Sequence, residues 1–196
     1  MAIAAVIGLG NPGSEYEKTR HNVGFRVVDE LARRWRVASW EHRYRALLGR
    51  RSGSRSVLLC KPQTFMNLSG DAVALLCRGA ELTPAECLVV VDDVELPLGQ
   101  LRLRERGGAG THNGLRSIAA TVGDSFPRLR LGVCGREPWR DLAEYVLADF
   151  EESERELAED MTRRAADCLE MALHAGLARA ANHFNRLPDS EPEGEP

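Results

Sequence analysis

The fold of this chain is decided by one stretch near its start, residues 8–25, which read GLGNPGSEYEKTRHNVGF. A short apolar run, residues 3–7, leads into this stretch and predicts a buried strand. The loop that follows is rich in glycine, which permits close backbone approach and positive φ and so leaves groups open to a ligand. His21 lies at the end of this loop, just before residues 24–37, whose apolar residues recur at helical spacing. The stretch therefore predicts a strand, a ligand-facing loop and a helix in succession.

Two later stretches share the character of this loop. They are KPQTFMNLSG (residues 61–70) and the glycine-rich segment 107–117, and each places asparagine or histidine beside glycine. We interpret the three loops as parts of one composite site.

Strand and helix patterns alternate along the rest of the chain. Predicted strands cover residues 3–8, 44–50, 56–60, 87–91, 100–105 and 128–133, and predicted helices cover residues 24–37, 65–82, 113–122, 139–150 and 152–185. Core candidates of the last helix are Leu157, Met161, Cys168, Met171 and Leu177. The alternation, with a hairpin across the polar turn 51–55, predicts an α/β fold: a single three-layer domain with a mixed sheet. We expect residues 1–186 to form this domain and the acidic, proline-rich residues 187–196 to be a disordered tail.

Composition points to an ordinary globular protein. The chain has 196 residues, of which 43% are hydrophobic and 28% charged, and its formal net charge is −3. Its apolar runs are too short to span a membrane. Five scattered cysteines without a CxxC pair argue against a disulfide framework and against structural zinc. We therefore expect a cytoplasmic protein that does not bind a membrane.

Charge is distributed unevenly. Residues 102–136 hold seven arginines against two acidic residues, whereas residues 151–196 hold five arginines against twelve. A basic centre beside an acidic C-terminal part is compatible with phosphate binding in one place. From charge alone, a solvated, salt-bridged surface is the simpler interpretation of the same residues.

The motif Gly8-x-Gly10-x-x-Gly13 after a strand matches the dinucleotide-binding fingerprint. That fingerprint needs a helix opening at the third glycine and an acid at the end of the next strand. Here the polar residues 14–20 delay the helix, and the acids at the right distance fall within it. A dinucleotide-dependent oxidoreductase is therefore a remote alternative.

His21 and Asp92 are the candidate catalytic pair. Imidazole, with a pKa near ~6.5, suits a general base at neutral pH. Asp92 follows the predicted strand 87–91, where α/β folds place their ligand crevice, and could hold the imidazole in one tautomer. The alternatives are a capping or packing role for His21 and a turn role for Asp92. We assign Asp93 and Glu95 to the turn.

Three asparagines, Asn11, Asn67 and Asn113, could polarise a carbonyl or recognise peptide backbone without adding charge. Helix N-capping is the alternative for Asn67 and Asn113, and His112 could cap a helix or order its loop. No GxSxG motif supplies a nucleophile, and the other histidines form no metal-ligand spacing. The residues suggest attack by water on an acyl group, without metal.

Four motifs carry a resemblance to a known family: GLGNPGSEYEKTRHNVGF, KPQTFMNLSGDAV, VDDVELPLGQLRLRERGGAGTHNGLRSI and RLRLGVCGREP with YVLADF. In this order, and over residues 3–185, they resemble the bacterial-type peptidyl-tRNA hydrolases. The resemblance implies an α/β, phosphorylase/hydrolase-like fold with a twisted mixed sheet flanked by helices. It also implies a monomer without cofactor or obligate protein partner that cleaves the ester between a peptide and the 3′-terminal ribose of tRNA.

The resemblance also implies roles for individual residues. His21 is the proton acceptor, Asp92 stabilises its basic form, and Asn11 discriminates blocked from free aminoacyl-tRNA. Further implied substrate contacts are Tyr16, Phe65, Met66 (lining the peptide channel), Asn67 and Asn113, with His112 as support, and Arg104 and Arg130 as a phosphate clamp. A non-catalytic RNA-binding relative of the same fold is the main alternative.

Two departures from the family pattern concern loop geometry. Thr111 stands where many relatives have glycine, and a β-branched residue would be strained there if the position required positive φ. The segment 132–138 carries one extra residue against the usual pattern.

Overall fold

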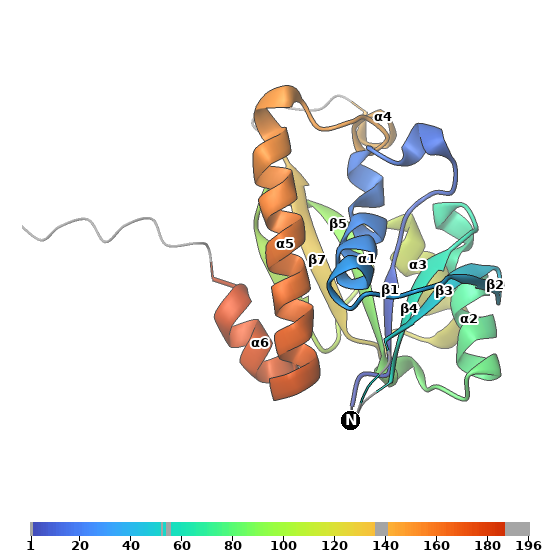
Figure 1. The fold of residues 1–196 in the computed structure, drawn as a ribbon. Coiled ribbons are helices and arrows are strands. Elements are labelled where there is room, and N and C mark those ends of the chain that lie inside the picture. Colours follow the sequence, from blue (N-terminus) through green and yellow to red (C-terminus); the bar gives the residue numbers. More distant parts are fainter. Residues whose placement is uncertain (1, 52, 54–55, 136–140, 187–196) are drawn as a thin grey trace, which may run out of the picture.

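The computed structural model describes residues 2–51, 53, 56–135 and 141–186. A seven-stranded sheet in the order β2-β3-β4-β1-β5-β7-β6 forms the middle layer. Figure 1 shows α1 and α5 on one face of this sheet and α2 and α3 on the other. This confirms the predicted three-layer α/β architecture with a mixed sheet.

The centre of the sheet is parallel and its edges are antiparallel. The strands are β1 (Ala5–Gly8), β2 (Glu41–Arg43), β3 (Ala46–Arg51), β4 (Val57–Pro62), β5 (Cys87–Pro97), β6 (Leu101–Arg104) and β7 (Arg128–Cys134). β1 pairs in parallel with β4 and β5, and β5 pairs in parallel with β7. β2, β3 and β6 add antiparallel partners at the edges. The carboxyl ends of the four parallel strands therefore share one edge of the molecule.

Helices and 3-10 turns connect the strands. The helices are α1 (Val23–Arg34), α2 (Ser69–Gly79), α3 (Asn113–Val122), α4 (Leu142–Val146), α5 (Glu152–Ala175) and α6 (Leu177–Phe184). The 3-10 turns are η1 (Ser14–Tyr16), η2 (Arg20–Asn22), η3 (Met66–Leu68) and η4 (Pro84–Glu86). Three of these turns, η1, η2 and η3, lie in two of the three loops that the sequence marked as parts of a site.

The glycines at either end of the first loop bring α1 against β1. A Cβ at Gly8 would clash with the carbonyl oxygen of Gly24, and a Cβ at Gly24 would lie 2.5 Å from both the nitrogen of Leu9 and the oxygen of Val90. No side chain fits between these backbones. This close contact fixes the start of α1, and with it η2, against the end of β1.

Two apolar cores fill the spaces between the layers. One joins α1 and α5 to the sheet and includes Val28, Leu31 and Leu169. The other joins α2 and α3 to the opposite face and includes Leu76 and Ile118. Together they hold the sheet edge that carries the site.

The structure corrects several sequence predictions. β5 does not end at Val91 but runs on to Pro97, so Asp92 lies inside the strand. The helix expected over residues 152–185 is broken at Gly176, whose φ of 90° is left-handed and ends α5. Leu157, a predicted core residue, is 44% exposed. The edge strand β2 was not predicted, because its three residues are all exposed and show no alternation.

Some predictions concern residues outside the described part of the chain. They are the tail 187–196, part of the turn 51–55, and the end of the segment 132–138 with its extra residue.

Candidate active site

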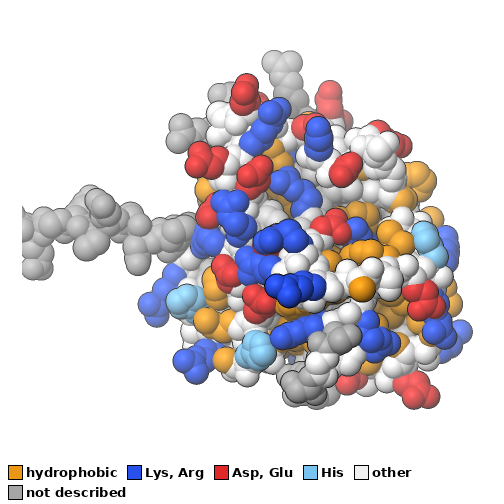
Figure 2. Space-filling view, viewed as in Figure 1, with side chains coloured by type: hydrophobic (Ala, Val, Ile, Leu, Met, Phe, Trp, Pro, Cys, Tyr) orange, Lys and Arg blue, Asp and Glu red, His pale blue; other side chains and the backbone are white. Residues whose placement is uncertain are grey.

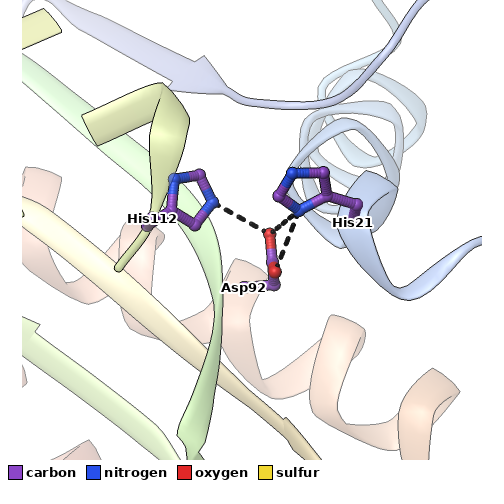
Figure 3. Close-up of side chains that lie close together, drawn as sticks. All are labelled: His21, Asp92 and His112. Atoms are coloured by element: carbon purple, nitrogen blue, oxygen red, sulfur yellow. Dashed lines mark hydrogen bonds and ion pairs between the residues drawn. The ribbon is translucent and has the colours of Figure 1, made fainter. Parts of the chain in front are cut away.

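Asp92 lies between two histidines from different parts of the chain (Figure 3). Its Oδ1 lies 2.9 Å from Nδ1 of His21 and 3.0 Å from Nε2 of His112. Its Oδ2 lies 3.0 Å from the same nitrogen of His21. All three residues are buried. The carboxylate lies on β5, and His21 lies in η2. His112 is the residue that immediately precedes α3.

The hydrogen bonds fix which ring nitrogens carry protons. The backbone N–H of Leu115 donates to Nδ1 of His112 at 3.2 Å, so the proton of this ring lies on Nε2 and points at Asp92. An ionised carboxylate can only accept, so His21 must donate from Nδ1. Nε2 of His21 then carries a free lone pair. The arrangement leaves His21 ready to take a proton.

The carboxyl of Asp92 stays ionised in this setting. Burial by itself raises its pKa, but the positive charge that His112 and His21 can carry, with their hydrogen bonds, outweighs burial and holds the pKa of Asp92 below its ordinary value. A permanent negative charge next to His21 stabilises an imidazolium there.

The same three side chains are close enough to hold a metal ion. However, a metal on Nε2 of neutral His112 would move the proton to Nδ1, which would then face the N–H of Leu115. Metal binding would therefore break the cap of α3. The hydrogen-bonded pair of histidines explains these residues without that cost.

A second arrangement orients the amide of Asn11. Asn22 accepts from the N–H of Asn11 at 2.8 Å and donates to its carbonyl at 2.9 Å. The backbone N–H of Met66 donates to Oδ1 of Asn11 at 2.8 Å. Its oxygen is thus engaged, and Asn11 lines the adjoining cavity, so Nδ2 is the group left to bind a ligand. Asn22 was not singled out from the sequence, although its place beside His21 in a turn-rich loop was a signal.

A cavity of about 960 Å³ opens over these groups. Tyr16 and Phe65 meet edge to face at its mouth, with ring centroids 6.5 Å apart, and Phe65 is 56% exposed. Ten of the eleven predicted site residues line it: Asn11, Tyr16, His21, Phe65, Met66, Asn67, Asp92, His112, Asn113 and Arg130. Arg104 is exposed in β6 and does not line the cavity.

The alternatives for individual residues can now be compared with their contacts. The N-cap of α3 is His112, whereas Asn113 is the first residue of the helix and is exposed. Asp93 accepts from the N–H of Glu95, as expected of a turn residue, but also from Nη1 of Arg130 at 2.9 Å. Thr111 is not among the residues with positive φ, which falls on Gly110 instead. The threonine is therefore not strained.

The far wall of the cavity was not anticipated from sequence. It consists of α4 residues and their flanks, including Leu142, Val146 and Leu147. Buried Arg20, next to His21, ties this wall to η2: its guanidinium lies 4.5 Å from the centre of the Tyr145 ring and donates to Glu154 at 2.8 Å. Its backbone N–H donates to Ala148. An arginine in the motif gave no sign of this role, because its partners follow more than a hundred residues later.

The glycine fingerprint does not build a dinucleotide site. The turn η1 follows Gly13, and α1 begins only at Val23. Gly8 instead allows the close contact with Gly24. Across the described ranges, none of the helices combines the length and apolar character that crossing a bilayer requires.

Known proteins resemble this chain over most of its length. The family model for peptidyl-tRNA hydrolase matches residues 5–193. A peptidyl-tRNA hydrolase of Roseiflexus castenholzii is 52% identical over 96% of this chain and 89% of its own length. One from Chloroflexus aurantiacus is 49% identical over 93% of this chain and 98% of its own length. The crystal structure of peptidyl-tRNA hydrolase from Acinetobacter baumannii superposes with a TM-score of 0.87 at 32% identity, covering 93% of this chain and 94% of that one. The chain belongs to the peptidyl-tRNA hydrolase family.

Proposed function

We propose that this chain hydrolyses the ester between a peptide and tRNA by direct attack of water, with His21 as general base. The observation that carries this proposal is the His21–Asp92 contact of 2.9 Å, in which Asp92 takes up Nδ1 and leaves Nε2 free. The substrate is inferred from the family, and the chemical step is inferred from the geometry of the site.

The steps follow from the positions of the groups. Nε2 of His21 removes a proton from water, and the resulting hydroxide adds to the ester carbonyl. An asparagine amide, from Asn67 or Asn113 on the cavity wall, donates to the developing oxyanion. Collapse expels the ribose oxygen, which takes the proton back from His21. Asp92 stabilises the intermediate imidazolium throughout.

Recognition is divided among the other cavity residues. The Nδ2 of Asn11 can donate a hydrogen bond to the carbonyl of a blocked amino group, which free aminoacyl-tRNA lacks. Tyr16, Phe65 and Met66 provide apolar surface for the peptide and the terminal base. Arg104 and Arg130 are proposed phosphate contacts. We propose a monomeric enzyme by resemblance to its family, and the five free cysteines support the reducing cytoplasm as its compartment.

The test is release of amino acid from N-acetyl-aminoacyl-tRNA, with unblocked aminoacyl-tRNA alongside. We expect rapid cleavage of the blocked substrate only, and a fall in kcat of roughly 10²–10⁴-fold in His21→Ala. His42→Ala, which removes an exposed histidine of β2, is the matched control and should retain full activity.

The competing function is RNA binding without hydrolysis, on the same fold. It predicts that the wild type binds the tRNA and leaves the ester intact. Such a result would overturn the proposed function.

A further inference from the structure

Several basic side chains on one face of the molecule are paired with acids of the same chain. Figure 2 shows Lys and Arg side chains over α1 and α5, interleaved with Asp and Glu. Lys61 pairs with Asp29, and Arg34 pairs with Glu30 and Asp167. These side chains would have to break their ion pairs before they could bind a phosphate. A phosphate is therefore bound more easily by an arginine or lysine that has no acidic partner.

Arg130, one of the two proposed clamp residues, is also largely engaged. Its Nη1 donates to Asp93 at 2.9 Å and its Nη2 donates to the carbonyl of Gly108 at 2.8 Å. The side chain is only 16% exposed. Its charge is therefore compensated at the cavity wall.

Arg116 is different. It lies on α3, three residues after Asn113, so both face the same side of the helix, and both line the active-site cavity. Its Nε donates to the carbonyl of Gly110 at 2.9 Å, which holds the side chain against the glycine loop. Within residues 2–51, 53, 56–135 and 141–186 no acid pairs with it, and the residue is exposed. Its outer edge, Nη1 and Nη2, is available.

From this arrangement we infer that Arg116 binds a backbone phosphate of the single-stranded 3′ end of tRNA at the rim of the cavity. The inference rests on the proposed function, since the ester at the end of that strand must reach His21. Guanidinium presents two parallel N–H groups to a phosphate. Fixing Nε to Gly110 selects the edge that does so and lowers the entropy lost on binding. Arg116 would supply a basic contact besides the exposed Arg104 and the largely engaged Arg130.

The experiment measures kcat and KM for N-acetyl-aminoacyl-tRNA at several salt concentrations, in the wild type and in Arg116→Gln. We expect KM to rise by about 3–10-fold with kcat unchanged, and the slope of log affinity against log salt to fall by about 1. Arg116→Lys keeps the charge but not the fork and should fall between them. Arg78→Gln removes an exposed arginine of α2 that does not line the cavity, and should behave as the wild type.

A second substrate separates phosphate binding from other roles. N-acetyl-aminoacyl-adenosine has the ester but no phosphate, so Arg116→Gln and the wild type should cleave it at equal rates. Unequal rates, or an unchanged KM and salt slope on full tRNA, would overturn the assignment of Arg116. Failure of the wild type to cleave either substrate would instead overturn the proposed function, which keeps the two conclusions apart.

Discussion

Asn22 occupies the N-cap position of α1, yet its side chain makes no capping bond and instead binds both backbone groups of Asn11. A capping side chain at this position would contribute about 1 kcal/mol to the helix. Asn22 does not make this capping bond. It instead links the loop that carries Asn11 to the turn that carries His21. In the proposed function, recognition and chemistry are thus held in one unit.

We predict that Asn22→Ser lowers discrimination more than stability. Serine is a good N-cap, so α1 should be retained, but its side chain is too short to reach both groups of Asn11. The ratio of kcat/KM for blocked over unblocked aminoacyl-tRNA should fall about tenfold, as expected for one or two lost hydrogen bonds. Asn11→Ala should lower the same ratio. An unchanged ratio in Asn22→Ser would show that Asn11 does not depend on this link.

Asp92→Asn should abolish most activity while the protein stays folded. The amide has nearly the shape of the carboxylate but cannot accept from both histidines in the same way or stabilise an imidazolium. We expect kcat to fall roughly 10²–10⁴-fold. Asp93→Asn, which disturbs the pair with Arg130 but not His21, is the matched control. Activity of Asp92→Asn within about twofold of wild type would contradict the role given to Asp92.

The free energy of unfolding at acidic pH should depend on the ionisation of Asp92. Because the pKa of Asp92 in the folded chain lies below its ordinary value, its ionised form stabilises the fold above that ordinary value, near ~3.9. The stabilisation is lost as pH falls toward the lowered pKa. The difference in unfolding free energy between wild type and Asp92→Asn should shrink as pH falls below about 4. Denaturant titrations at each pH measure it, and a difference that grows as pH falls below about 4 would have the wrong sign.

His112→Asn should separate the two contacts of this histidine. Asparagine is a strong N-cap, so the bond to Leu115 can be replaced, whereas the bond to Asp92 is lost. We expect a change in unfolding free energy within about 1 kcal/mol, with kcat reduced about 10-fold. His112→Ala loses both contacts and should be less stable. If His112→Asn kept full activity, the second histidine would serve the helix alone.

Gly24→Ala should destabilise the fold strongly. Its Cβ would lie 2.5 Å from backbone atoms of both Leu9 and Val90, which can yield only if α1 moves. A loss of roughly 3–5 kcal/mol in unfolding free energy is expected. Gly108→Ala is the control, because nothing lies within 4 Å of its Cβ, and its effect should stay within about 0.5 kcal/mol. Equal stabilities of the two variants would disprove the close contact.

Much of the fold could be predicted from local patterns in the sequence. α3 was predicted over residues 113–122 and is observed there, because its apolar spacing and its boundaries are local signals. The end of β5 was misplaced, because Asp92 and Asp93 have partners distant in sequence that stabilise charged residues within a strand. The break at Gly176 was missed, because the apolar residues on either side continue the same period.

The candidate site, too, was predictable from the sequence only in part. Residue types near turns pointed to His21, Asp92 and the asparagines, since glycine-rich loops leave such polar side chains open to a ligand. The wall formed by α4 meets the cavity mainly with apolar residues, which look like any other packing surface. The proton positions on His112 depend on a bond to Leu115 and could be known only from geometry.

The strand order also has a consequence for biosynthesis. β5 lies between β1 and β7, and His21 and Asp92 are 71 residues apart. Pairing over such separations forms late, and β5 gains its second neighbour only after residue 134 has been made. While it is being translated, this chain is itself a peptide joined to tRNA. The proposed catalytic pair is therefore expected to assemble only after most of this peptide has been joined to its tRNA.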